Sequence, residues 1–391
     1  MFTRHANAFI LASFVLFIIV LLTSIFSYHK ETSEIIYQTL AVKLSHHQAY
    51  NLQNTQILKS LPKNLYDNQL FFYPPAFIIV LAFFNLFAGG IGFNLVGPLL
   101  YILTAITISK SVLLLTKSKN LEIKAFVISM FSSMLLFTST KVLMDLFMVL
   151  MSVLSFYFLL LFREKNKSGY VFLSGLFLVL GILTKYVPVI LLIFYLPLLF
   201  QYLKEKNKFE QIYLYFIPFL LIVFWLESIF KLPLSKDYLL HFPTKEMLSS
   251  LSFLNYAAHR PFYFYFLNIF LINPLYIFIF LLFKRRILNS LNQKYNLLFF
   301  IGCSLLILST FTVLAFFGST FQMRFILLAE PFLIILLTFV NFEDFKLTRI
   351  LFFVFLIQNV LLFIFNTILL KSPEMFSLLE LMKIVHNKGL G

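Results

Sequence analysis

Two acidic and three basic residues stand near the ends of long apolar runs, where proton transfer and anion binding can be combined. The acids are Glu34 and Asp145, and the basic residues are Lys185, Arg260 and Arg324. A carboxylate can accept the proton of an attacking hydroxyl group. Arg and Lys side chains can stabilise negative charge that develops on a departing phosphate. The set therefore suits transfer of a group from a phosphate-bearing donor, with Glu34 or Asp145 as the base.

Three further side chains near the same segment ends are candidates for substrate contacts: Tyr37, Tyr73 and His259. A metal site is not expected, because the adjacent pair His46 and His47 has no third ligand in the sequence pattern. The lone cysteine, Cys303, excludes an intrachain disulfide and makes a zinc–thiolate site a poor explanation. No cofactor is expected, and a divalent metal has no support from the residues.

Each candidate also has an ordinary structural role. Lys185 can extend its ammonium to a membrane interface, and Asp145 can cap the helix that follows it. Glu34 can be a solvated loop residue, and the segment 73–75, Tyr-Pro-Pro, can simply start a helix. The functional interpretation depends on all the candidates lying on one side of a membrane.

The composition identifies the elements that must position these residues. Hydrophobic residues make up 61% of the 391 residues and charged residues only 12%, with a mean hydropathy of +0.93. A soluble domain of this size needs more polar surface, so we expect an all-α polytopic membrane protein. The net charge of +15 does not indicate nucleic-acid binding, because Lys and Arg lie in short loops between apolar runs.

Runs of roughly 20 apolar residues predict about eleven transmembrane helices. They lie near 7–28, 93–116, 125–140, 146–162, 170–186, 187–203, 211–229, 263–283, 297–317, 325–341 and 348–370. The run 74–88 is shorter, begins with two prolines and ends at Gly89-Gly90. We interpret it as a re-entrant or juxtamembrane helix that does not cross. The first run is retained as a span, since it is longer than the apolar part of a signal peptide.

This topology places the basic clusters of the short loops on one side, as the positive-inside rule requires. The inside segments carry Arg4, Lys117, Lys119, Lys124, Arg163, Lys165, Lys167, Lys204, Lys206, Lys208, Lys284, Arg285, Arg286, Lys294, Lys346 and Arg349. The short outside turns carry only Lys141, Lys185 and Arg324. We therefore expect a multi-pass protein of the cell (inner) membrane with a cytoplasmic N-terminus. The C-terminus and the candidate residues fall on the extracytoplasmic face.

The domain organisation expected is a single membrane domain over 1–391 with no separate soluble domain. A first outer loop, 29–92, contains juxtamembrane helices, and a second long outer loop covers 230–262. Within the first loop, residues 32–44 predict a short amphipathic helix, because Ile36, Leu40 and Leu44 recur at helical spacing.

Several segments, taken in order, resemble motifs of the GT-C superfamily of integral-membrane glycosyltransferases. The likeness is to protein O-mannosyltransferases, lipid A aminoarabinose transferases and polyprenyl-phosphate-mannose-dependent mannosyltransferases. The segments are Ser33-Glu34-Ile-Ile-Tyr37-Gln-Thr-Leu-Ala41, Phe72-Tyr73-Pro74-Pro75, Asp145, Gly181 to Lys185, His259-Arg260-Pro261-Phe262-Tyr263 and Arg324-Phe325 through Pro331. Ser33 stands where the family pattern has Asp. The resemblance implies an inverting transfer from a polyprenyl-phosphate sugar, with the first-loop acid as base, to a lipid, glycan or protein acceptor.

Two other classes stay open from the sequence. A membrane transporter or a flippase for lipid-linked sugars tends to place polar groups near the bilayer midplane and to use broken helices. The deeper polar residues here are Asn268, Gln358 and Asn359, and none of them is ionisable. A structural subunit without a site requires instead that the candidate residues be scattered in space. Membrane lipids are expected partners in every case.

Overall fold

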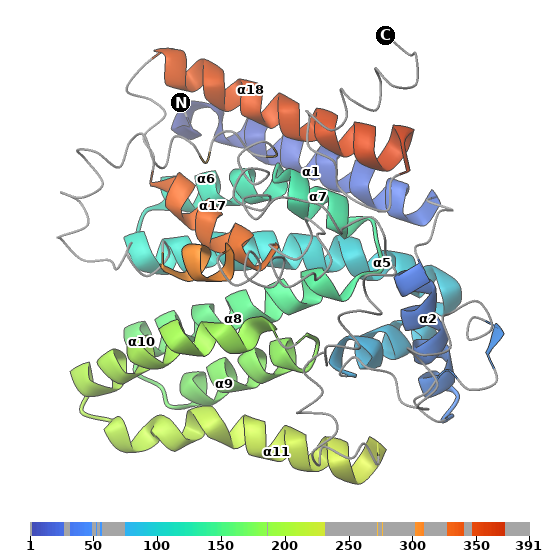
Figure 1. Ribbon diagram of the computed structural model, residues 1–391. Coiled ribbons are helices and arrows are strands. Elements are labelled where there is room, and N and C mark those ends of the chain that lie inside the picture. The colour runs from blue at the N-terminus through green and yellow to red at the C-terminus, as the bar shows by residue number, and fades with distance from the viewer. Residues whose placement is uncertain are drawn as a thin grey trace.

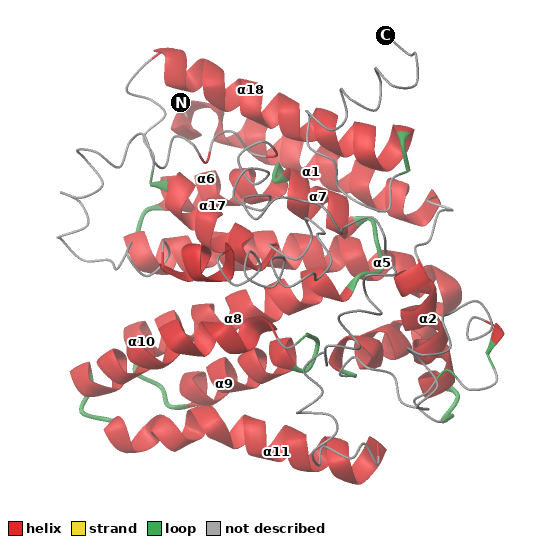
Figure 2. Cartoon of the chain, viewed as in Figure 1, coloured by secondary structure: helices red, strands yellow, loops and turns green. Residues whose placement is uncertain are grey.

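The computed structural model describes residues 2–26, 32–48, 52, 55–56, 75–185, 187–230, 272, 276, 302–308, 327–339 and 346–371. Within these ranges every regular element is helical and no strand occurs (Figure 2). The α-helices are α1 (Phe2–Phe26), α2 (Thr32–Ser45), α5 (Ala76–Thr116), α6 (Lys119–Met130), α7 (Ser133–Ser139), α8 (Met144–Lys165), α9 (Gly169–Ile182), α10 (Leu192–Glu205), α11 (Ile212–Phe230), α17 (Glu330–Thr338) and α18 (Lys346–Phe363). Short 3-10 helices, Val187–Leu191 and Phe209–Gln211, precede α10 and α11, and a π-helix, Ile364–Leu369, continues α18.

Five helices in the described part of the chain are long and apolar enough to cross a membrane. They are Ala6–Phe26, Ala76–Thr116, Met144–Lys165, Val187–Glu205 and Phe352–Leu369. The pair α6 and α7 can make a sixth span, although the two are bent by 56°. Most of the predicted runs 263–283 and 297–317 lie outside the described residues, so the count of about eleven stays a prediction.

The long helix α5 is broken at Gly89, where the sequence predicts that the run 74–88 ends. Gly89 has φ +57° and ψ −146°, a conformation that residues with a Cβ avoid. An unbroken helix of this length would measure about 60 Å, roughly twice the hydrocarbon thickness of a bilayer. In Figure 1 the part before the break packs beside α2, and the part after it runs along α8.

Helix α8 lies at the centre of the bundle, since 83% of its most apolar stretch is buried. It packs mainly against α9 and α5, and hydroxyl groups hydrogen-bond across its contacts with α9 and α10. Ser155 and Ser174 hydrogen-bond at 3.1 Å, and the Tyr195 hydroxyl donates to the Ser152 carbonyl at 2.9 Å. Buried hydroxyl groups that find partners on neighbouring helices are typical of close packing in membranes. The predicted span 146–162 thus corresponds to the most enclosed of the five described helices that are long enough to cross a membrane.

The run 125–140, predicted as a span, is divided between α6 and α7 and bent by 56°. Helix α6 ends at Met130, and α7 starts after Ser132, whose side chain accepts a hydrogen bond from the Leu135 amide. The Tyr101 hydroxyl donates to the Met130 carbonyl beside the break. These side chains satisfy backbone groups that the bend releases, which is the condition for breaking a helix inside a bundle. Hydropathy alone does not detect such a break.

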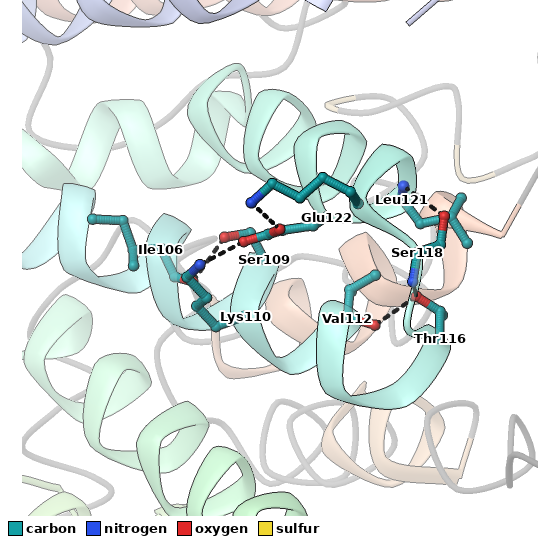
Figure 3. A network of polar contacts seen from close by, with 9 residues as sticks. Ile106, Ser109, Lys110, Val112, Thr116, Ser118, Leu121 and Glu122 are labelled. Carbon is teal, nitrogen blue, oxygen red and sulfur yellow. Dashed lines mark hydrogen bonds and ion pairs between the residues drawn. The ribbon is translucent and has the colours of Figure 1, made fainter. Parts of the chain in front are cut away.

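The basic end of the bundle is held by ion pairs. Glu122 in the first turn of α6 binds Lys110 of α5 at 2.7 Å (Figure 3). The same carboxylate binds Lys119 at 2.6 Å. Lys117 binds Glu164 near the end of α8 at 2.5 Å. Lys124 is buried and donates to the carbonyl of Thr338, the last residue of α17, at 2.8 Å. The lysines at this end of the bundle therefore also link the ends of α5, α6, α8 and α17.

Candidate functional site

Glu34 is a buried acid at the start of α2. Only 3% of the residue is exposed, and its Oε2 accepts a hydrogen bond of 2.8 Å from the backbone N–H of Val142. The helix agrees with the one predicted over 32–44, and Ile36 and Leu40 are buried as expected. The interpretation of Glu34 as a solvated loop residue is wrong, because α2 packs against the first part of α5 and also meets the turn before α8.

Asp145 and Lys185 form a direct ion pair. The Lys185 ammonium lies 2.6 Å from the Asp145 carboxylate, and the two side chains are 14% and 3% exposed. The expectation that Asp145 caps its helix is wrong, since Leu143 occupies the cap position and Asp145 lies within the first turn of α8. The expectation that Lys185 only extends towards an interface is wrong too, because its ammonium binds a carboxylate inside the protein.

One turn of the chain brings the three charged side chains into a single neighbourhood. The Val142 N–H, in the segment between α7 and α8, binds Glu34. Three residues later, in the first turn of α8, the Asp145 carboxylate binds Lys185. Gly97 of α5 lies directly behind this turn. A Cβ at Gly97 would come within 2.2 Å of the Ser139 carbonyl oxygen and 3.0 Å of the Lys141 carbonyl oxygen. The absence of a side chain at Gly97 therefore sets where the turn can lie.

Aromatic rings and one backbone contact complete the surroundings. Tyr37 of α2 meets Phe77 of α5 edge to face at 6.2 Å, and Phe77 meets Phe147 of α8 at 5.9 Å. The Ala76 amide donates to the Leu183 carbonyl at 3.2 Å, which ties the start of α5 to the end of α9. Tyr37, predicted as a substrate contact, is buried in this packing.

We call this group the helix-end cluster. It consists of Glu34, Tyr37, Phe77, Val142, Asp145, Phe147 and Lys185. The remaining predicted site residues, Tyr73, His259, Arg260 and Arg324, lie outside the described residues. The helix-end cluster therefore contains both candidate bases and one of the three candidate phosphate-binding residues.

Two parts of the arrangement could not be found by motif reasoning. The Val142 N–H is a backbone donor, so no side-chain pattern signals its contact with Glu34. Glu330 is buried at the start of α17, and its Oε1 accepts a hydrogen bond of 2.6 Å from the Ser132 hydroxyl at the α6–α7 break. The only feature of the sequence that indicated this contact is the position of an acid, Glu330, within an apolar run.

The described residues contain no group of three or more His, Cys, Asp or Glu side chains placed to hold a metal ion. His46 and His47 lie exposed just after α2. Comparison of the chain with protein-family models finds no match, and neither does comparison with curated proteins.

Proposed function

We propose that the chain is a glycosyltransferase that moves a sugar from a polyprenyl-phosphate donor to a lipid, glycan or protein acceptor. One observation carries the proposal: Glu34 and the Asp145–Lys185 pair, from three separate segments, meet at a single turn. The resemblance of the ordered motifs to GT-C glycosyltransferases supports the same reaction. Such a reaction needs a carboxylate to accept a proton and, close to it, a cation to stabilise the leaving phosphate.

In the proposed reaction, the acceptor hydroxyl gives its proton to Glu34 or Asp145, and its oxygen attacks the anomeric carbon of the sugar. The bond between that carbon and the phosphate oxygen breaks, and its electron pair stays with the phosphate. Lys185 stabilises the departing phosphate, together with Arg260 and Arg324. Attack opposite the leaving group inverts the anomeric configuration. No step in this scheme requires a cofactor.

The proposed topology has about eleven spans, a cytoplasmic N-terminus and the helix-end cluster on the extracytoplasmic side. The ends of α5, α8 and α10 that carry basic residues lie together at one end of the bundle (Figure 1), joined by Lys117–Glu164 and Arg163–Glu205 ion pairs. The helix-end cluster lies at the other end, near α2. The part of α5 before Gly89 would then enter the outer leaflet and turn back.

The topology is tested by thiol labelling in intact cells. Cys303 is replaced by Ala, and single cysteines are placed at exposed Lys117 or exposed His47. An impermeant maleimide should label the cysteine at 47 and spare the one at 117 until the membrane is opened. Labelling of both from the same side before opening would overturn the proposed orientation.

The activity is tested with purified protein or membranes supplied with polyprenyl-phosphate sugars and candidate acceptors. Glu34→Gln and Asp145→Asn keep side-chain size but remove a proton-accepting group, so at least one should lose about 10²-fold or more of the rate. His47→Gln, at an exposed residue after α2, is the matched control. Full activity in both acidic variants would remove the proposed catalytic roles.

A second candidate function, transport or flipping of a lipid-linked sugar, is favoured by a different observation. The bent α6–α7 pair carries Ser132, which binds buried Glu330 of α17. Ionisable groups at helix breaks inside the membrane are typical of transport pathways. In proteoliposomes this function predicts movement of labelled substrate that Glu330→Gln abolishes and Glu34→Gln leaves intact. Sugar transfer that Glu34→Gln abolishes and Glu330→Gln leaves intact would favour the glycosyltransferase.

A further inference from the structure

Two turns at the basic end of the bundle share one five-residue pattern. Residues 163–167, Arg-Glu-Lys-Asn-Lys, end α8, and residues 204–208, Lys-Glu-Lys-Asn-Lys, end α10. In both, the asparagine adopts the left-handed conformation, with φ 54° at Asn166 and 52° at Asn207. Asn166 caps α8 directly, and Asn207 follows Lys206, the cap residue of α10. Asparagine tolerates this conformation better than most residues, so both turns have a local cause. We call them the twin basic turns.

The twin basic turns contact each other. The Lys208 ammonium donates to the Asn166 carbonyl at 3.1 Å, and the Arg163 guanidinium lies 3.9 Å from the Glu205 carboxylate. The same guanidinium lies 5.2 Å from the centre of the Tyr202 ring. Although the two turns are separated by α9 and α10 in sequence, they form one continuous surface.

This surface carries an excess of positive charge. Glu164 is bound by Lys117 and Glu205 lies beside Arg163, while Glu210 is the next acid along the chain and is exposed. Four further lysines of the turns form no ion pair with any described residue: Lys165, Lys167, Lys204 and Lys206. Their ammonium groups are thus available to bind an anionic group.

Exposed aromatic rings border the lysines. Phe200 on α10 and Phe209 at the start of the next helix stack at 5.5 Å, although they are 39% and 55% exposed. Tyr213, one helical turn further on, is also exposed. Rings beside lysines at the end of a spanning helix are characteristic of the boundary between acyl chains and headgroups.

We propose that the twin basic turns bind the phosphate headgroup of an anionic phospholipid, with the Phe200–Phe209 pair against the upper part of its acyl chains. Charge complementarity selects an anion, and the exposed rings select a lipid over a soluble phosphate. The proposal does not depend on the reaction at the helix-end cluster, since the two surfaces lie at opposite ends of the bundle (Figure 1).

The test uses the full-length protein, purified in a neutral detergent, with phosphatidylglycerol or phosphatidylcholine of identical acyl chains added. Bound lipid is counted by native mass spectrometry. One variant changes Lys165, Lys167, Lys204 and Lys206 to Gln, and the matched variant changes the same four to Arg. Unfolding temperature in phosphatidylcholine alone checks that both variants are folded.

The wild-type protein and the Arg variant should prefer phosphatidylglycerol, and the Gln variant should lose about tenfold or more of that preference. Raising the salt concentration should weaken the preference in the wild type as well. An equal preference in the Gln and Arg variants would overturn the proposal. Loss of phosphatidylglycerol binding on addition of millimolar inorganic pyrophosphate would also overturn the proposal. The surface would then select phosphate irrespective of the lipid.

Discussion

Lys185 binds Asp145 at 2.6 Å although the two residues are 40 positions apart and belong to the end of one helix and the start of another. Both side chains are largely buried, so water cannot solvate either charge fully. Each charge therefore depends on its partner for stabilisation. The ion pair thus does two things in the proposed enzyme. It fixes the cation for the donor phosphate, and it locks the ends of α8 and α9 together.

Removing one partner of this pair should destabilise the protein. We expect Lys185→Met or Asp145→Asn alone to lower the free energy of unfolding by about 3 kcal/mol, because each leaves a buried group of the other residue unpaired. The measurement is unfolding of the purified protein in mixed micelles. The double variant Asp145→Asn with Lys185→Met should recover part of the loss. A double variant that loses the sum of both single effects would show that the residues do not interact.

A methyl group at Gly97 should displace the turn that carries Val142 and Asp145. The added Cβ would lie 2.2 Å from a backbone oxygen that cannot rotate away, so the turn or α5 must shift. We expect Gly97→Ala to lower stability by about 1–3 kcal/mol and to reduce sugar transfer further than that loss explains. Gly90→Ala is the control, because its Cβ would meet no atom of the described residues within 4 Å. Equal behaviour of the two variants would contradict a role for the Gly97 contact.

The break in α5 should depend on Gly89. Its φ of +57° with ψ of −146° is a backbone conformation that almost only glycine adopts. An added Cβ would meet no atom of the described residues within 4 Å, so backbone strain is the only expected penalty. Gly89→Ala should therefore cost about 1–3 kcal/mol through backbone strain, or straighten the helix. Cysteine cross-linking between α2 and the part of α5 before the break would report straightening. Gly90→Ala again serves as the neighbour without a positive φ, and a Gly89→Ala protein as stable as that control would argue against strain.

Ser132 and Ser133 are adjacent, both buried, and should respond differently to loss of the hydroxyl. Ser132 donates to Glu330 and caps α7, whereas the Ser133 hydroxyl has no hydrogen-bond partner among the described residues. Ser132→Ala should lower the free energy of unfolding by about 1–3 kcal/mol. Ser133→Ala should be neutral or slightly stabilising. Thermal unfolding of the two variants side by side is the measurement, and a larger loss in Ser133→Ala would refute the assignment of the polar contact.

The sequence predicts those features of the fold that have local causes. The apolar runs near 146–162 and 187–203 correspond to α8 and to the helices over 187–205, because a run of about 20 apolar residues has few alternatives in a membrane. The end of the run 74–88 coincides with the break at Gly89 for a similar reason, since glycine is the residue that permits it. The helix of the first loop, with Ile36 and Leu40 inside, follows from its spacing.

Other features depend on neighbours that hydropathy does not record. The bend between α6 and α7 exists because Tyr101 and Ser132 satisfy backbone groups that would otherwise be exposed to an apolar interior. Asp145 has the residue type of a helix cap, yet a lysine brought in by α9 decides its role. Such outcomes are set by which helix ends meet, and no local pattern contains that information.

For the candidate site, residue types alone indicated acids and cations suited to phosphate-linked transfer, because carboxylates and ammonium groups have fixed chemistry wherever they lie. Tertiary structure alone decided that Glu34 binds the Val142 amide 108 positions away and that Lys185 pairs with Asp145. Burial makes the difference. Once water is excluded, each charged group must find a partner within a few ångströms, and the packing of α2, α5, α8 and α9 determines which partner is in reach.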